Sequence, residues 1–214
     1  MKLRVEEIPA LDIADRPKTV QLLERVESFP IACVNWAEHF PYCPQTEVRM
    51  AHNGRELFVH FRVDETRTAA LQKEDNKQVC EDSCVEFFLA PDETGYYNFE
   101  FSCIGTLMLG FRKERPHAVL ATPEVLQQVK RIPSLGNACF TEKSLDAPWE
   151  LLAMIPTKAL FRHQFTTWKG ICARANLYKC GDRLSTRHYV TFAPINTPKP
   201  DFHRPEHFVP IEFL

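Results

Sequence analysis

Alternating apolar and polar residues run through most of this chain, most clearly between Cys80 and Gly105. Two alternating segments there flank a short loop at residues 91–95, which predicts a β-hairpin with one apolar and one polar face. With that loop, the register brings Glu86 directly opposite Glu100. Their Cβ atoms would lie about 5 Å apart, so the two carboxylates would repel unless a cation, a proton or a ligand lies between them.

This carboxylate pair has two interpretations from the sequence. In one, the register shifts by two residues, or an arginine such as Arg174 or Arg49 neutralises a structural cluster. In the other, the pair belongs to a polar binding face, to which Asn98 on the same side of the second segment also contributes.

Further alternating segments follow at short intervals, separated by turn residues. An Asn53-Gly54 dipeptide predicts a type I′ hairpin turn, which needs positive φ at both positions. Helix is scarce, with residues 18–27 as the best candidate and a single turn at 157–161. We therefore predict an all-β fold, a jelly-roll-like β-sandwich of two antiparallel sheets, in a single domain spanning residues 1–214. The predicted strands are 31–36, 46–52, 56–63, the 84–103 hairpin, 106–111, 125–132, 149–155, 170–178 and 187–195.

Composition and charge narrow the classes of partner. The formal net charge of −2 provides no basic field for a nucleic-acid backbone. No apolar run reaches the roughly 20 residues of a membrane helix, and acidic residues stand where a signal peptide would have its apolar segment. We therefore expect no nucleic-acid or membrane partner and a cytoplasmic protein as the sequence is written; with a leader segment in front of it, the protein would be periplasmic or secreted.

Most of the eight cysteines are expected to be small buried apolar residues, because without an export signal an even count is poor evidence of disulfides. No two cysteines have the two-residue spacing of a zinc knuckle. Pro205 lies between His203 and His207 and disrupts a helical pair of metal ligands. These spacings argue against a zinc site, and the sequence otherwise leaves the metal content unknown.

A second polar face is predicted in residues 170–178, where polar and apolar residues again alternate. Carboxylates, an arginine, amides and a phenol are the groups that pair with sugar hydroxyls, each of which both donates and accepts. An aromatic ring would cover the apolar face of the sugar, although each aromatic residue could instead pack in the core. Residues 179–182 and 201–206 are expected as loops that border this face, or as charges that pin the C-terminal loop. The predicted ligand-binding residues are Glu86, Asn98, Glu100, Arg174, Asn176, Tyr178 and Phe192.

A resemblance to a known family rests on four segments in matching order and spacing. They are EDSCVEFFLAPDETGYYNFEFSCIGTLMLG (81–110), WELLAMIP (149–156), ANLYKCGD (175–182) and HYVTFAPINTPKPDFHRPEHF (188–208). On these segments the chain resembles family 9 carbohydrate-binding modules, most closely their family 9-like relatives of Bacteroidetes, within the DOMON-like β-sandwich superfamily. The resemblance spans nearly the whole chain.

The resemblance implies a sugar site. In the family's sugar binders, two tryptophans sandwich a terminal sugar ring while a glutamate, an arginine and amides hold its hydroxyls. The glutamate position matches Glu86, the tryptophan positions match Cys80 and Phe192, the arginine position matches Glu100, and an amide position matches Arg174. The expected function is thus non-catalytic carbohydrate binding associated with glycan degradation, with a rewritten sugar clamp and a glycoside hydrolase as a candidate partner.

Two other functions stay open. A retaining glycoside hydrolase needs two carboxyl groups about 5 Å apart, which Glu86 and Glu100 would supply, although mid-strand positions on a solvated face argue against a raised pKa. Haem binding would need an axial pair such as Met108 with a histidine. We expect no cofactor other than a structural calcium ion, to which Asp92 and Asp182 could contribute.

Overall fold

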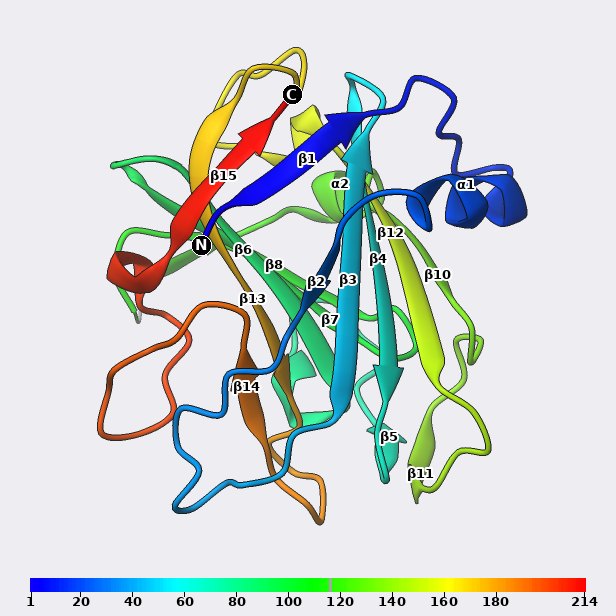
Figure 1. The fold of residues 1–214 in the computed structure, drawn as a ribbon, viewed down its shortest axis with the longest axis vertical. Helices are drawn as coiled ribbons and strands as arrows, with labels where there is room; N and C mark the ends of the chain where they lie inside the picture. Colours follow the sequence, from blue (N-terminus) through cyan, green and yellow to red (C-terminus); the bar gives the residue numbers. More distant parts are fainter. Residues whose placement is uncertain (116) are drawn as a thin grey trace.

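Strands make up most of the regular structure in the computed structural model, which describes residues 1–115 and 117–214 (Figure 1). The strands are β1 (Leu3–Glu7), β2 (Ser28–Pro30), β3 (Gln45–His52), β4 (Glu56–Asp64), β5 (Thr68–Ala70), β6 (Cys84–Asp92), β7 (Gly95–Ser102), β8 (Leu107–Arg112), β9 (Ala118–Leu120), β10 (Lys130–Pro133), β11 (Phe140–Lys143), β12 (Trp149–Pro156), β13 (Cys172–Cys180), β14 (Tyr189–Thr191) and β15 (Val209–Phe213). The helical elements are α1 (Arg16–Leu23), α2 (Pro123–Leu126) and the 3-10 turns η1 (Val79–Glu81), η2 (Thr157–Ala159) and η3 (Pro205–His207). The all-β prediction is confirmed.

The strands form a sandwich whose two layers are joined through β1. The hydrogen-bonded order is β10-β12-β4-β3-β1-β15-β13-β6-β7-β8-β9, with β14 beside β13, β2 beside β3, and a separate β5-β11 pair. Strand β1 runs parallel to both β15 and β3, whereas the sequence predicted antiparallel pairing throughout. No hairpin connects β1 to either neighbour, so the chain does not impose an antiparallel direction there. Strands β1 and β15 lie side by side at the two ends of the chain (Figure 1).

The hydrophobic core lies between the two layers. The predicted inward stripe of β4 is confirmed, because Leu57, Val59, Phe61 and Val63 are all fully buried in it. From the opposite layer, the predicted apolar stripes of β6 and β7 meet them, so the alternation in the sequence does separate the core face from the outer face. The outer-face residues of β6 and β7 are therefore the ones that remain for a site.

The β6-β7 hairpin has the predicted register over most of its length. Glu86 pairs with Glu100, as expected. Near the turn a bulge between Leu89 and Asp92 shifts the pairing, so Asp92 pairs with Gly95 in place of the expected pair of residues 90 and 96. The bulge adds one residue to β6 without moving the carboxylate pair.

The β3-β4 hairpin is also confirmed, but its turn is not of type I′. Gly54 has a φ of 94°, whereas Asn76 is the only non-glycine with positive φ among the described residues. The Asn53 side chain instead accepts hydrogen bonds from the backbone N–H groups of Arg55 (3.1 Å) and Glu56 (2.9 Å). This Asx turn closes the loop without a left-handed Asn53.

Several predicted boundaries were wrong for identifiable reasons. Residues 125–132 were predicted as one strand, but Pro123 begins the short helix α2 there and strand pairing starts only at Lys130. Residues 31–36 make a single bridge through Cys33 rather than a strand. Strands β1 and β15 were not predicted, and β15 contains Pro210, a residue that lacks a backbone N–H for strand pairing.

The longest helix is close to its predicted position. Helix α1 begins at Arg16, where the Asp15 side chain accepts a hydrogen bond from the backbone N–H of Lys18 at 3.2 Å and Pro17 occupies the first turn. Nowhere in the described part of the chain does a helix reach the length and apolar character required to span a membrane.

Candidate functional site

A cavity of about 310 Å³ opens on the outer face of strands β13, β6, β7 and β8. We call it the carboxyl pocket. Its floor comes from alternating outward side chains of the strands, and its rim comes from the segment around η1, the turn after β13 and the loop before η3. The lining residues are Asn76, Lys77, Gln78, Cys80, Glu86, Glu100, Met108, Arg112, Arg115, Cys180, Asp182, Tyr189, Pro200, Asp201, Phe202 and His203.

A second apolar cluster closes the outer face beside the pocket. Trp36, Tyr178, Phe202 and Phe208 belong to this cluster, which joins the strand residues to the loops that cross them. The rings of Tyr178 and Phe202 stack with centroids 4.3 Å apart, and the Tyr178 hydroxyl donates to the Phe202 carbonyl at 3.1 Å. The loop carrying Phe202 is thereby fixed over the sheet and forms one wall of the pocket.

Glu86 and Glu100 lie at the centre of the pocket and are almost completely buried, with 2% and 6% of their surfaces exposed. The expectation of a solvated face is therefore wrong, because the rim loops cover these strands. Burial, and then the neighbouring Glu100, raise the pKa of Glu86 well above its ordinary value. Burial also raises the pKa of Glu100, to about 7. Protons therefore relieve the repulsion between the two carboxyl groups at neutral pH.

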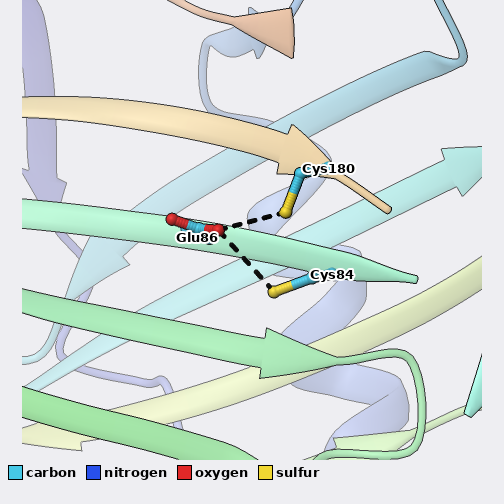
Figure 2. A group of neighbouring side chains, drawn as sticks. All are labelled: Cys84, Glu86 and Cys180. Atoms are coloured by element: carbon cyan, nitrogen blue, oxygen red, sulfur yellow. Dashed lines mark hydrogen bonds between the residues drawn. The ribbon is translucent and has the colours of Figure 1, made fainter. Parts of the chain in front are cut away.

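Thiols and an amide donate the hydrogen bonds to these carboxyl groups. The Cys180 thiol donates to Glu86 Oε1 at 3.2 Å, and the Cys84 thiol lies 3.9 Å from the same atom (Figure 2). Asn98 Nδ2 donates to Glu100 Oε1 at 2.9 Å. Arg174 and Arg49, which were considered as neutralising cations, contact other groups instead.

Of the two arginines that line the pocket, Arg112 and Arg115, Arg112 is linked to the carboxyl groups through Asn98. Its Nε donates to Asn98 Oδ1 at 3.1 Å, and its positive charge lowers the pKa of Glu100 against the larger effect of burial. Asn98 is fully buried and does not line the pocket. It therefore positions Arg112 and Glu100 relative to each other. Asn98 was predicted to bind the ligand, but it lies beneath the pocket surface and supports the residues that line it.

The rim supplies further polar and aromatic groups. Asp201 pairs with Arg115 at 3.0 Å, and His203 Nδ1 lies 3.0 Å from the hydroxyl of Tyr96. Burial raises the pKa of Asp182 at the opposite side of the rim. The two predicted border loops, 179–182 and 201–206, do meet at the pocket, because residues of both line it.

Besides Asn98, four more of the seven predicted ligand-binding residues do not line the pocket. Arg174 donates to Glu93 at 3.1 Å and to the Pro205 carbonyl at 3.1 Å. Asn176 is fully buried, and its Oδ1 accepts from the backbone N–H of Ala193 at 2.9 Å. The other two are Tyr178, which packs in the apolar cluster described above, and Phe192, which packs in the main core against Phe29.

The candidate calcium ligands are not brought together. Asp92 lies at the end of β6 far from Cys84, which by strand geometry is about 26 Å away. Asp182 is on the pocket rim near the Cys84 end of that strand, because Cys84 pairs with Cys180. One ion therefore cannot contact both carboxylates. Met108, considered as an axial haem ligand, lines the pocket with its sulfur 3.0 Å from Asn98 Nδ2.

Two sets of site residues were missed by the sequence reasoning. Arg112 could have been found by extending the alternation of β8, which places Met108, Gly110 and Arg112 on the outer face opposite β7. The pairing of Cys84 with Cys180 had no signal in sequence spacing. The expectation of mostly buried cysteines was wrong as well. All eight cysteines are free thiols within the described residues; three are buried, two are half-buried, and Cys43, Cys139 and Cys172 are exposed.

Comparisons with known proteins agree with this architecture. The model of carbohydrate-binding family 9 matches residues 16–213. A crystal structure from Bacteroides uniformis ATCC 8492, described as a candidate carbohydrate-binding protein, shares 36% identity with a TM-score of 0.92 and covers 100% of this chain and 99% of that chain. No match was found among curated proteins.

Two further solved structures come from a family 9 carbohydrate-binding module of Caldicellulosiruptor kristjanssonii. The complex with glucose is 12% identical with a TM-score of 0.60, and covers 100% of this chain and 96% of that chain. The complex with cellotriose is 11% identical with a TM-score of 0.59, and covers 100% of this chain and 93% of that chain. At these identities the likeness concerns the fold.

Proposed function

We propose that this protein holds its sugar in the carboxyl pocket. The chain belongs to carbohydrate-binding family 9 and binds carbohydrate without catalysing its turnover. The observation that carries this proposal is the concentration of buried hydrogen-bonding groups around one cavity, with Glu86 and Glu100 at its centre. Small-molecule sites are typically concave and contain a few fixed polar groups among apolar ones.

The protonation of the pocket suits sugar hydroxyls. A sugar hydroxyl donates one hydrogen bond and accepts others, so its partners must together do both. A protonated Glu86 donates through one oxygen and accepts through the other, and a carboxyl group with a pKa of about 7, such as Glu100, is present in both forms near neutrality. Arg112 adds a group that only donates.

The shape of the pocket favours a small ligand. A volume of about 310 Å³ is at the lower end of the range of about 300–1,000 Å³ for small-molecule sites. Phe202 and Tyr189 on the rim provide aromatic surface for the C–H face of a ring. Of the two tryptophan positions that the resemblance assigned, Cys80 lines the pocket and Phe192 is in the core. We therefore propose a monosaccharide or the end of a chain as ligand, held against the Phe202 side.

The family match favours binding over the alternative of a glycoside hydrolase. A retaining mechanism needs one of two carboxyl groups ionised as the nucleophile while the other carries the proton. Burial raises the pKa of both Glu86 and Glu100, that of Glu100 to about 7, so protonation alone does not separate the two functions. What favours binding is the match to a carbohydrate-binding family over nearly the whole chain.

A glycan array followed by calorimetry tests the proposed function. In the presence of a chelator, the wild type should bind at least one mono- or oligosaccharide, and Glu86→Ala should bind it at least about tenfold more weakly, since a hydrogen bond to a buried polar group is lost. The matched control is Glu93→Ala, an exposed carboxylate on the same hairpin outside the pocket, which should keep wild-type affinity. Equal affinity of wild type and Glu86→Ala would remove the carboxyl pocket from the account.

A further inference from the structure

Two thiols and a carboxyl group meet at the inner end of the carboxyl pocket. Cys84 on β6 pairs directly with Cys180 on β13, and Glu86 lies two residues along β6, so all three side chains leave the same face of the sheet. The two sulfur atoms and a carboxyl oxygen of Glu86 all lie within 4.8 Å of one another, and all three residues are buried (Figure 2).

We propose that Cys84, Cys180 and Glu86 form a binding site for a thiophilic divalent cation of the zinc class, with a fourth coordination position open to the carboxyl pocket. This inference goes beyond sugar binding and does not rest on it, because the three ligands are present whether or not a sugar is bound.

The interatomic distances are close to those of a tetrahedral site. Zinc–sulfur distances near 2.3 Å and zinc–oxygen distances near 2.1 Å place sulfur and oxygen about 3.6 Å apart in a tetrahedron. The Glu86 oxygen lies 3.2 Å from the Cys180 sulfur and 3.9 Å from the Cys84 sulfur, so the observed distances lie on either side of that value. Shifts of a few tenths of an ångström in the sulfur and oxygen positions would bring both distances to the tetrahedral value.

The chemistry of the ligands selects the class of cation. Two thiols, which are soft ligands, together with one carboxyl group suit zinc and its analogues, whereas calcium requires six to eight oxygen ligands. In the metal-free protein, thiol protons lie between the sulfurs and the Glu86 oxygen. A bound cation would replace these protons and hold the ligands in the same arrangement.

The fourth position follows from which ligands reach the cavity. Glu86 and Cys180 line the carboxyl pocket, whereas Cys84 lies behind them and does not. An ion between the three would therefore face the cavity on one side only, where a solvent molecule can enter. Three protein ligands and an open position are the arrangement of zinc sites that exchange a ligand, in contrast to closed structural sites with four protein ligands.

Cobalt(II) titration of the reduced, metal-free full-length protein tests the site. Exposed thiols are removed first by replacing Cys43, Cys139 and Cys172 with serine, and this triple variant is the reference. We expect one cobalt ion per chain, with sulfur-to-cobalt charge-transfer absorption and the intense visible bands of a tetrahedral site, both abolished by one equivalent of Zn²⁺. Adding Cys84→Ser or Cys180→Ser to the reference should remove the charge-transfer bands.

A second measurement covers variants that fail to fold. Glu86→Gln keeps both thiols but replaces the proposed carboxylate ligand with a neutral amide. It should weaken cobalt binding at least about tenfold, since losing even a group that only orients a metal ligand costs about 10–100-fold. Zn²⁺ should also raise the Tm of the reference protein, and should not raise that of the reference with Cys84→Ser. Absence of tetrahedral cobalt bands in the reference protein, or equal affinity of Glu86→Gln, would overturn the proposal. Sugar binding is measured with chelator present, so its outcome is independent of this one.

Discussion

Replacing Lys179 with methionine should lower the free energy of unfolding by about 3–5 kcal/mol, the cost of leaving a buried charge without its partner. The Lys179 ammonium lies inside the sandwich with no exposed surface, 2.8 Å from Glu65 Oε2 and 2.8 Å from His188 Nε2. Glu65 also accepts a hydrogen bond from the indole of Trp149 at 2.7 Å. Without Lys179, the Glu65 carboxylate would keep this single donor inside an apolar core.

The buried ring of His188 also has Lys179 as a hydrogen-bond partner. Burial, and then the Lys179 charge, lower the pKa of His188 to about 3, so the ring is neutral in the folded protein. Its Nδ1 is within hydrogen-bond distance of the Thr186 carbonyl at 2.9 Å, which leaves Nε2 as the acceptor for Lys179. Because the pKa of His188 is lower in the folded protein than its ordinary value of 6.5, protons bind preferentially to the unfolded chain. The contribution of His188 to the stability of the folded protein is therefore lost as the pH falls from 6.5 towards 3.

Urea unfolding monitored by tryptophan fluorescence measures the effect of Lys179→Met. The control is the double variant Lys179→Met with Glu65→Leu, which removes both charges and should recover much of the lost stability, since apolar replacements of buried ion pairs are often neutral or stabilising. A loss below about 1 kcal/mol in the single variant, comparable to that of a surface ion pair, would contradict this role.

Replacing Arg112 with leucine should weaken sugar binding about tenfold to a hundredfold. Arg112 lines the pocket and offers a charged donor that Asn98 fixes next to Glu100, and hydrogen bonds of charged groups contribute about 1.5–3 kcal/mol. The substitution also frees Asn98 Oδ1, so the amide no longer holds Glu100 in a fixed position.

The control for Arg112→Leu is Arg174→Leu. Arg174 lies on the same outer face but pairs with the exposed Glu93, so its loss should leave sugar affinity unchanged and cost little stability. Calorimetry with the best-binding sugar measures both variants, and thermal unfolding checks that each is folded. Loss of binding in Arg174→Leu with retention in Arg112→Leu would place the sugar away from the carboxyl pocket.

Sequence reasoning was sufficient for the face and register of the central hairpin. Strand alternation has a period of two residues, and the short loop limits the pairing, so Glu86 and Glu100 could be placed opposite each other. The same alternation separated the core stripe of β4 from its outer side chains. These features depend on residues that are close in the chain.

What the sequence could not provide is which part of the outer face remains open. Alternation places Asn176 and Tyr178 on the same face as Glu86, but only the paths of later segments determine that they are covered: Asn176 by the segment at Ala193 and Tyr178 by the loop around Phe202. Phe192 was expected as a stacking surface, but it faces the core. The meeting of Cys84 with Cys180, and of Lys179 with Glu65, depends on pairing between distant segments of the chain.

The most direct test of the carboxyl pocket is a crystal structure of the protein with the sugar that binds best in calorimetry, grown or soaked in the presence of a chelator. We expect a sugar ring in the pocket, with hydroxyls within hydrogen-bond distance of Glu86, Glu100 or Arg112 and a C–H face against Phe202 or Tyr189. A sugar bound elsewhere on the protein, with the carboxyl pocket holding only solvent, would contradict the proposed site.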